Sequence, residues 1–301
     1  MRIVETFEEV RKASSGITGL VPTMGYLHEG HLSHLAAARN ETDTVVVSLF
    51  VNPLQFNEQH DLDRYPRDLV RDRRLVAEAG ADLLFAPPLE VMYPVPALTR
   101  VAVPLLEAEM EGALRPGHFE GVATVVAKLL AGLQPHRAYF GRKDAQQLAI
   151  VRRMAFDLSF PVEIIGGQTV RESDGLALSS RNVFLTGDER IRARGLSQGL
   201  MAAADAYEAG VRDAGTLEGI VRKKVTGGEI DYVTLADANT AARILEVDRD
   251  AFLAVAARVG STRLIDNLPL MVEPGGAMSV DRGIRLTGPS ILYGDGHAVD
   301  H

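Results

Sequence analysis

The chain has 301 residues, of which 46% are hydrophobic and 24% charged, a composition typical of a globular protein with a substantial core. Its formal net charge is −8, so the composition does not favour nucleic acid as a partner. The absence of cysteine excludes disulfides, thiolate nucleophiles and cysteine-ligated metal centres. The sequence contains neither an apolar run long enough to span a membrane nor the apolar core of a signal peptide, and we expect a cytoplasmic protein.

Short apolar runs alternate with amphipathic stretches through the first half of the chain. Strands are predicted at residues 17–21, 44–50, 81–86, 137–140 and 162–166. Helices are predicted at residues 31–40, 68–79, 122–133 and 144–157. Wholly apolar runs suit strands buried on both faces, and strands that alternate with helices favour a parallel sheet. Residues 1–169 are therefore predicted to form an α/β, Rossmann-like domain with helices on both faces of the sheet.

The pattern changes in the second half, where residues 170–186 are polar and loop-like. Thr186 and Glu189 have the spacing of a capping box, and the helix that follows is predicted to run to about Gly210. A further helix is predicted at residues 216–224, and strands at 230–235, 252–258 and 262–267.

These elements predict a smaller α+β domain over residues 170–270. The Gly-Ser pair at 260–261 suits a tight turn between its last two strands. Residues 271–301 are rich in glycine and proline. They form an extension to which the sequence assigns no role, either a tail or an extra strand.

The sequence PTMGYLHEGH at residues 22–31 lies between the first predicted strand and the first predicted helix. Ligands bind at the carboxyl edge of parallel sheets, and a helix N-terminus offers unpaired N–H groups to an anion. His28 and His31 are three residues apart and share one face of the opening turn, while Gly30 allows close approach to the backbone. Two imidazoles there suit phosphate oxygens and the charge that develops in phosphoryl or nucleotidyl transfer.

Two other interpretations of this motif stay open. The histidines would be ordinary, partly exposed helix residues, or they would bind zinc with His34 continuing the spacing. The zinc-protease pattern His-Glu-x-x-His places its second histidine one position later, and the chain has no cysteine to complete a tetrahedral site. We therefore favour phosphate contacts.

Further polar sequences follow predicted strands or occupy turns, at residues 52–56, 65–72, 111–119, 139–147 and 171–182. Their amides suit a carboxylate or hydroxyl, their lysine and their serines beside an arginine suit phosphate, and an aspartate suits Mg²⁺. Taken singly, each also fits an ordinary turn, loop or solvated helix. The sequence has no Walker A and no Rossmann glycine pattern, so phosphate recognition is expected to depend on these groups together with His-x-Gly-His.

Six sequences, in this order, resemble those of the pantoate–β-alanine ligase family: PTMGYLHEGH, FVNPLQF, RYPRD, RPGHFEGV, FGRKDAQQL and ESDGLALSSRN. The resemblance spans residues 21–267, and it places the chain among the nucleotidyltransferases that share the His-x-Gly-His signature. It implies that pantoate attacks the α-phosphate of ATP to give pantoyl adenylate and pyrophosphate. The amine of β-alanine then gives pantothenate, a coenzyme A precursor, and AMP. It also implies Mg²⁺, a homodimer and a second domain that acts as a lid.

The resemblance carries roles to individual positions. The residues expected to be catalytic are His28, His31, Lys143, Ser179, Ser180 and Arg181. Those expected to bind ATP are Met24, His28, His31, Gly141, Lys143, Asp144, Val170, Leu178, Ser179, Ser180 and Arg181. Those expected to bind pantoate are Pro22, Met24, Gln55 and Gln147. Asp72 is the expected Mg²⁺ ligand, and Glu111 and Arg115 are expected to support the pantoate pocket.

Three positions depart from the pattern common in the family: Arg142 stands in place of Glu, Ala145 in place of an aromatic residue and Leu178 in place of Met. A nucleotidyltransferase for a phosphorylated acceptor shares the histidine signature, but it lacks the sequences at 52–56 and 141–147. A nucleotide-binding module without activity is disfavoured because His28, His31 and Lys143 are all present.

Overall fold

The computed structural model describes residues 1–57, 59–273 and 275–293. The chain divides into two compact units, the first formed by Met1–Gly141 and Ile150–Gly167 and the second by Arg142–Ala149 and Gln168–His301. The last of the three boundaries, between Gly167 and Gln168, lies two residues before the one predicted after residue 169. Residues 142–149, however, belong to the second unit instead of the first. The last eight positions of the predicted extension, 294–301, lie outside the described residues.

The first unit is built on a sheet of six strands in the order β1-β4-β3-β2-β5-β6. The strands are β1 Arg2–Val4, β2 Thr18–Thr23, β3 Thr44–Leu49, β4 Leu83–Phe85, β5 Arg137–Gly141 and β6 Glu163–Gly167. Every neighbouring pair is parallel. Val45, Val46 and Val47 of β3 are at most 1% exposed, as expected for a strand covered on both faces.

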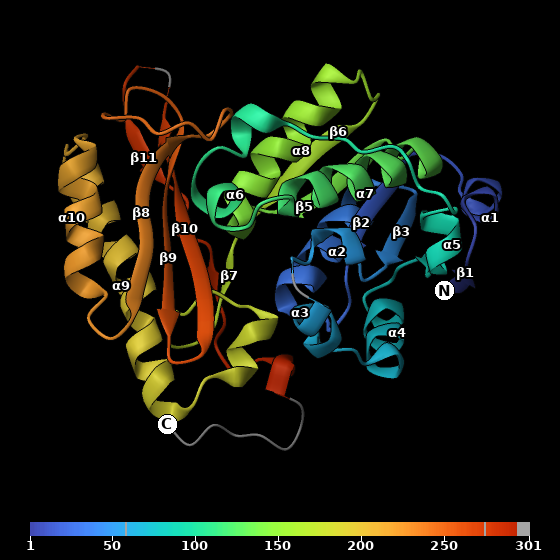
Figure 1. The fold of residues 1–301 in the computed structure, drawn as a ribbon, viewed down its shortest axis with the longest axis horizontal. Helices are drawn as coiled ribbons and strands as arrows, with labels where there is room; N and C mark the ends of the chain where they lie inside the picture. Colours follow the sequence, from blue (N-terminus) through green and yellow to red (C-terminus); the bar gives the residue numbers. More distant parts are fainter. Residues whose placement is uncertain (58, 274, 294–301) are drawn as a thin grey trace. The chain divides into compact units, whose positions relative to one another are not determined.

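The strand order reverses at β2, which lies between β3 and β5. Right-handed crossovers therefore place α2 on one face of the sheet and α7 on the other, because the chain moves in opposite directions there. The helices of this unit are α1 Phe7–Ala13, α2 Glu29–Glu41, α3 Gln59–Arg64, α4 Leu69–Glu78, α5 Leu89–Met92, α6 Met110–Leu114 and α7 His118–Leu133. The predicted α/β sheet is confirmed, and the switch point puts the end of β2 where ligands bind in such sheets (Figure 1).

The second unit contains a four-stranded antiparallel sheet in the order β11-β10-β9-β8. Its elements are β7 Val170–Arg171, α9 Gly187–Glu208, α10 Ala214–Lys224, β8 Glu229–Asp237, β9 Ala251–Val259, β10 Thr262–Val272, β11 Met278–Val280 and β12 Ile284–Arg285. Helices α9 and α10 pack together against this sheet (Figure 1). Leu196 and Leu200 of α9 and Leu253 of β9 are at most 1% exposed in the core between them.

Several predicted local signals are confirmed here. Thr186 and Glu189 form the capping box that begins α9. Gly260, at φ 59°, makes the tight turn that brings Thr262 opposite Val259. Helix α8 Ala145–Asp157 also follows the predicted range closely and contributes residues to both units.

Other elements were not expected from the sequence. Strand β1 and helix α1 are short, and Val10 is the buried residue of α1, so neither produces a long periodic pattern. For the extension, an extra strand was one of the two alternatives: β11 adds an edge strand beside β10, and β12 pairs with β7.

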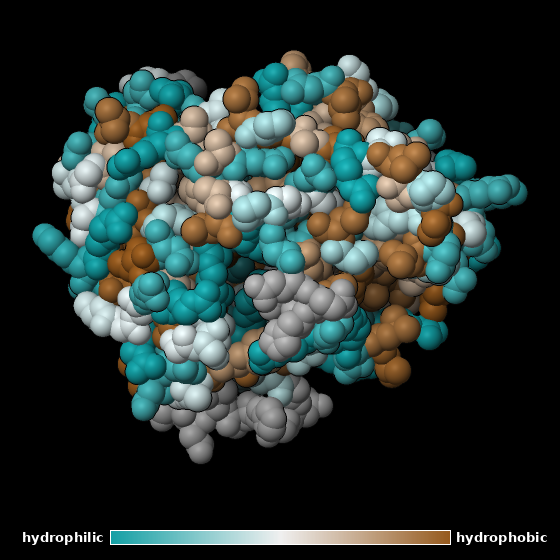
Figure 2. Space-filling model, in the orientation of Figure 1, coloured by the Kyte–Doolittle hydropathy of each residue, from teal (hydrophilic) through white to brown (hydrophobic). Residues whose placement is uncertain are grey.

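The described helices include none that is both long enough and apolar enough to cross a membrane. On the face drawn in Figure 2, apolar residues form small groups interspersed with hydrophilic ones. Small, scattered groups of apolar side chains are ordinary on a protein surface.

Candidate active site

The N-terminus of α2 carries the two signature histidines. Nδ1 of His28 accepts the N–H of Gly30, and Nδ1 of His31 accepts the N–H of His28, each at 3.2 Å. The two ring centroids are 4.1 Å apart. A ring nitrogen that accepts a hydrogen bond carries no proton, so a neutral imidazole held in this way has its proton on Nε2. The geometry therefore supplies two Nε2–H donors at a helix N-terminus, where an anion is favoured.

Asp72 of α4 holds the loop that leads to these histidines. Its Oδ2 accepts the N–H of Tyr26 at 2.7 Å, and its Oδ1 accepts the N–H of Leu27 at 2.8 Å. Gly25 has φ 87°, and a Cβ there would lie 2.9 Å from Oδ2 of Asp72, so the loop and the carboxylate fit closely. Burial raises the pKa of Asp72, and the two N–H contacts oppose that shift.

These contacts do not fit Asp72 as a Mg²⁺ ligand. Its side chain is engaged through both oxygens, and the residue is 1% exposed, whereas Mg²⁺ keeps several waters around it. Within the described part of the chain, no group of three His, Asp or Glu side chains is placed to hold a metal ion. Asp72 instead fixes the backbone ahead of His28.

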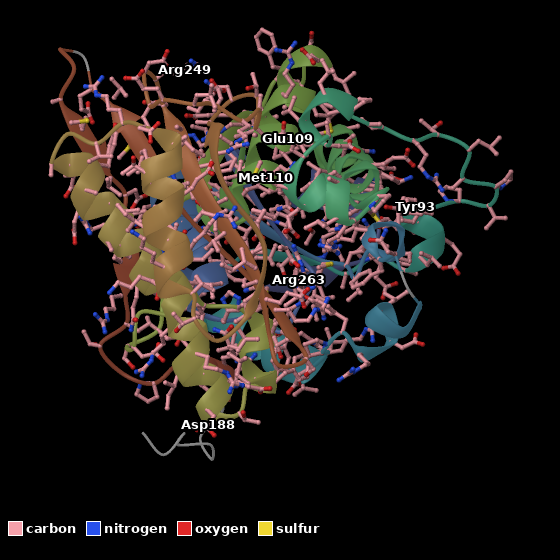
Figure 3. All side chains as sticks on the ribbon, turned by 60° about the vertical axis from the view of Figure 1, so that its left-hand side comes forward. Tyr93, Glu109, Met110, Asp188, Arg249 and Arg263 are labelled. Atoms are coloured by element: carbon pink, nitrogen blue, oxygen red, sulfur yellow. The ribbon has the colours of Figure 1, made fainter. Side chains whose placement is uncertain are left out.

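Gln55 lies after β3, in the short 3₁₀ helix Pro53–Gln55. Its Oε1 accepts a hydrogen bond from Nδ2 of Asn52 at 3.1 Å, and the hydroxyl of Tyr93 donates to Oδ1 of Asn52 at 2.8 Å. Tyr93, labelled in Figure 3, directly follows α5. Because Nδ2 of Asn52 donates to the oxygen of Gln55, the orientation of the Gln55 amide is fixed, with its nitrogen as the donor end. Two N–H donors there suit a carboxylate or a hydroxyl oxygen.

The backbone of Gln55 is held by the start of α7. Nδ1 of His118 donates to the carbonyl oxygen of Gln55 at 2.8 Å, and Nη1 of Arg115 donates to Nε2 of His118 at 3.1 Å. A Cβ on Gly121 would lie 2.4 Å from the carbonyl oxygen of Leu54. Only glycine allows this approach of helix and turn.

Sequence reasoning did not assign roles to His118 or Tyr93, and it described Asn52 only as an amide suited to a carboxylate or hydroxyl. The sequence does contain a signal for Asn52, because an amide directly precedes Pro53 at the end of a buried strand. Its target, the Oε1 of Gln55, depends on the 3₁₀ turn and could not be deduced from spacing.

In the second unit, Lys143 lies in the 3₁₀ turn Arg142–Asp144. Nδ2 of Asn267, on β10, donates to the carbonyl oxygens of Arg142 at 3.0 Å and of Lys143 at 2.6 Å. Asn267 is 3% exposed. The backbone that carries Lys143 is thus fixed by a buried amide.

Ser179, Ser180 and Arg181 lie at the start of the 3₁₀ helix Ser180–Phe184, where Oγ of Ser179 accepts the N–H of Arg181 at 3.3 Å. Nδ2 of Asn182 donates to Oε1 of Glu172 at 2.7 Å and to the carbonyl oxygen of Ala177 at 3.0 Å. Arg181 is exposed. The segment that carries the two hydroxyls and the guanidinium is therefore held in place by the hydrogen bonds of Asn182.

The remaining predicted positions differ in accessibility. Gln147 and Asp144 are partly exposed near the start of α8. Val170 and Leu178 are 5% and 1% exposed, and the N–H of Leu178 donates to the carbonyl oxygen of Val170 at 2.9 Å. In the first unit, Pro22 of β2 pairs with Ser48 of β3, so Met24 and Asn52 follow neighbouring strand ends.

The first unit thus brings together the histidines, Met24, Pro22 and Gln55 at the ends of β2 and β3. Gly141 ends the neighbouring strand β5. The second unit groups the Lys143 turn, β7 and the segment that begins at Ser179.

Comparison with known proteins decides the family. The family model described as pantoate-beta-alanine ligase matches residues 2–269. The chain belongs to the pantoate–β-alanine ligase family. Pantothenate synthetase from Moorella thermoacetica is 49% identical over 282 residues, with 91% of this chain and 100% of that protein covered.

Solved structures of the family agree with this fold. The crystal structure of pantothenate synthetase from Thermus thermophilus matches with a TM-score of 0.84 and 50% identity, over 89% of this chain and 98% of that one. The pantoate-beta-alanine ligase from Francisella tularensis, complexed with beta-gamma ATP and beta-alanine, matches with a TM-score of 0.73 and 33% identity, over 89% and 97%.

Proposed function

We propose that this chain condenses pantoate with β-alanine in an ATP-dependent reaction. A carboxylate oxygen of pantoate attacks the α-phosphorus, the bond to the β-phosphate breaks, and pyrophosphate leaves. The β-alanine amine then attacks the acyl carbon of the adenylate, AMP leaves, and the nitrogen loses a proton. The observation that carries the proposal is the family match over residues 2–269, which includes the paired histidines at the N-terminus of α2.

The proposed roles follow from the side-chain chemistry. The Nε2–H groups of His28 and His31 donate to phosphate oxygens and stabilise the charge that develops as pyrophosphate leaves. The amide nitrogen of Gln55, oriented by Asn52, donates to pantoate. Both steps depend on positioning and electrostatic stabilisation, without a covalent enzyme intermediate.

The second unit supplies the other proposed contacts. We assign the ATP phosphates to Lys143, Ser179, Ser180 and Arg181, since ammonium, hydroxyl and guanidinium groups all donate to anions. Gln147 is proposed to donate to pantoate and Asp144 to contact the ribose, and Gly141 of the first unit is proposed as a second ribose contact. Val170 and Leu178 are proposed to line the adenine side.

The proposal includes Mg²⁺ as part of the ATP substrate, because Mg²⁺ is usually held by substrate phosphates and waters with few protein ligands.

A homodimer is also proposed. Its support is the segment after α5 and the 3₁₀ helix Pro104–Leu106, in which Val95, Leu98 and Leu105 are 91%, 84% and 88% exposed, apolar side chains that a second copy would cover. Sedimentation at several concentrations tests the dimer.

The cytoplasm, where ATP is available, is the proposed location, and cell fractionation tests it.

The reaction is tested with ATP, Mg²⁺, pantoate and β-alanine, by following AMP and pantothenate together. Equal amounts of both products, each dependent on pantoate and β-alanine, are expected. Pyrophosphate release without AMP in the presence of the amine would contradict the proposal, and so would turnover with another acid in place of pantoate.

A further inference from the structure

The part of the extension that the structure describes, residues 271–273 and 275–293, folds back on the second unit. We call it the C-terminal extension. The family match ends at residue 269, so this segment lies beyond the region shared with the family. Strand β12 pairs in parallel with β7, with Ile284 opposite Val170 and Arg285 opposite Arg171. The extension therefore lies directly against the segment that leads to the proposed phosphate-binding residues.

A close backbone contact fixes this docking. Gly283 has φ 78°, and a Cβ there would lie 2.2 Å from the carbonyl oxygen of Thr169. The N–H of Ile284 donates to that same oxygen at 2.8 Å. No residue with a side chain fits this approach without displacement of β12 from β7.

Asp281 connects the C-terminal extension to the Lys143 turn. Nη1 of Arg142 donates to its Oδ2 at 2.7 Å, and Nε2 of Gln168 donates to its Oδ1 at 2.9 Å. The Asp281 side chain is 7% exposed and the Arg142 side chain 34%, so this part-buried ion pair is screened less than one on the open surface. Arg142 directly precedes Lys143 and adds a second positive charge. Asp281 neutralises that charge and holds the arginine in one direction.

Tyr293 connects the same extension to the segment that carries Ser179, Ser180 and Arg181. Its hydroxyl accepts from Nη1 of Arg190 at 2.6 Å and donates to Oε1 of Glu172 at 3.0 Å. That carboxylate oxygen also accepts from Asn182 at 2.7 Å. The buried pair Arg190–Glu172 is closed by a second contact of 2.6 Å. Tyr293 thus completes the network that anchors the residue next to Arg181.

We propose that the C-terminal extension is a positioning element for the ATP phosphates, in which Asp281 fixes the Lys143 turn through Arg142 and Tyr293 fixes the Ser179–Arg181 segment through Glu172. The inference rests on the proposed function, because that function assigns phosphate to Lys143 and Arg181. It also accounts for a departure from the family pattern. Arg142, which stands where Glu is common, has its carboxylate partner in a segment beyond the family match.

The sharpest test is Asp281→Asn in the full chain. Asparagine keeps an oxygen for Gln168 and Gly283 but removes the charged partner of Arg142. We expect kcat/KM for ATP in adenylate formation to fall about tenfold, as for the loss of one charge-assisted hydrogen bond, with KM for pantoate unchanged. Asp281→Glu is expected to restore most of the loss. Glu273→Gln, which removes one exposed carboxylate from the same extension, is the matched control and should behave as wild type.

Substitutions at two glycines supply a second, independent test variant with its matched control. Gly283→Ala and Gly276→Ala both place a side chain at positive φ, but a Cβ at Gly276 meets nothing within 4 Å. We expect Gly283→Ala to weaken ATP use and Gly276→Ala to leave it intact. A merely structural role would lower the melting temperature and change the KM values for ATP and pantoate alike, and that result would overturn the proposal.

The dissociation constant of a non-hydrolysable ATP analogue, measured without either acid, separates the two proposals. If wild type binds the analogue but makes no AMP from pantoate, the proposed function fails, and weaker analogue binding by Asp281→Asn still supports positioning. If wild type turns over and both Asp281→Asn and Gly283→Ala match it in analogue affinity and in kcat/KM, the positioning role is excluded.

Discussion

His31 combines two hydrogen-bonding roles in one ring. Its Nδ1 accepts the backbone N–H of His28, and that contact leaves the proton on Nε2, where a phosphate is proposed to bind. His31→Ala should lower kcat for adenylate formation by about 10²- to 10³-fold, the range for loss of one donor that acts on developing charge. Pyrophosphate release measures the effect.

Ser33→Ala is the matched control for His31→Ala. Oγ of Ser33 donates to the carbonyl oxygen of Gly30 in the same turn of α2, so its loss disturbs the helix start without removing a proposed phosphate donor. Near-wild-type pyrophosphate release from folded His31→Ala would contradict the assigned role. Equal losses in the two variants would assign the effect to the helix cap instead.

Asn52 is proposed to act on pantoate through Gln55. Asn52→Ala removes the donor that holds Oε1 of Gln55, so the Gln55 amide is free to rotate and Tyr93 loses its acceptor. KM for pantoate should rise about tenfold while KM for ATP stays constant, because about 1.4 kcal/mol is the usual scale of one buried hydrogen bond. Initial rates at varied pantoate and at varied ATP provide the measurement.

Asn57→Ala serves as the comparison, since Nδ2 of Asn57 donates to the carbonyl oxygen of Pro116 at the exposed end of the same loop. It should leave KM for pantoate unchanged. A rise in KM for both substrates in Asn52→Ala would show a general loss of structure and not a role in orienting Gln55.

For individual residues, the sequence predicted which chemical groups lie near the candidate site, but not which of them contact one another. The PTMGYLHEGH motif placed His28 and His31 at a helix start, and the structure confirms that location. The family resemblance, and not the residue pattern itself, implied that Asp72 is a Mg²⁺ ligand. A carboxylate on a helix face has no visible partner in sequence. Its partners are backbone N–H groups of Tyr26 and Leu27, and backbone groups carry no sequence signal.

Gly121 sets the distance between helix α7 and the turn that carries Gln55. Gly121→Ala would place Cβ 2.4 Å from the carbonyl oxygen of Leu54, so either the helix or the turn must shift. We expect a loss of about 1–3 kcal/mol in the free energy of unfolding, as for overpacking. A higher KM for pantoate should accompany it. Urea unfolding and initial rates measure the two effects.

Gly219→Ala in α10 provides the opposite case, because a Cβ there meets nothing within 4 Å. That variant should be stabilised by about 0.5–1 kcal/mol, since alanine is the better helix former. If both variants were stabilised, the close contact between α7 and the turn would be refuted.

Elements with strong local signals were predicted within a few residues, and the others were not. A run of valines predicts strand β3, and a capping box predicts the start of helix α9. Strand β12 has two exposed residues and pairs with β7, a segment more than a hundred positions earlier. Its existence depends on a long-range contact and on Gly283, neither of which appears as periodicity.

Over the whole chain, the six motifs sufficed to predict the family because they are spread across both units and occur in a fixed order. The role of the C-terminal extension could not be derived in this way. Asp281 and Tyr293 belong to no motif, and their partners Arg142 and Glu172 lie far away in sequence. The proposed role of these two residues depends on contacts that exist only in the folded chain.

Acid stability is a property of the whole chain, since helix caps in both units depend on ionised carboxylates. The Thr6 hydroxyl lowers the pKa of Glu9 from 4.5, the Thr186 N–H lowers that of Glu189 from 4.5, and the Thr216 hydroxyl lowers that of Asp213 from 3.8. Each pKa is lower in the folded state. These groups therefore contribute stability above their unfolded pKa values, and that stability is lost as the pH falls through the folded ones. Urea midpoints should be flat from pH 7 to about 5 and should fall below about pH 4.

The triple variant Glu9→Gln, Glu189→Gln, Asp213→Asn should start from a lower midpoint at pH 7 and lose less on acidification, because its caps no longer titrate. A control that replaces Glu78, Glu163 and Asp248 by their amides removes the same number of carboxylates but no helix cap. It should keep the acid transition of the wild type. The control also removes three exposed ion pairs, of Glu78 with Arg74, Glu163 with Arg137 and Asp248 with Arg249, which contribute little to stability. If the two triple variants have the same pH profile, the acid response belongs to total charge and not to the caps.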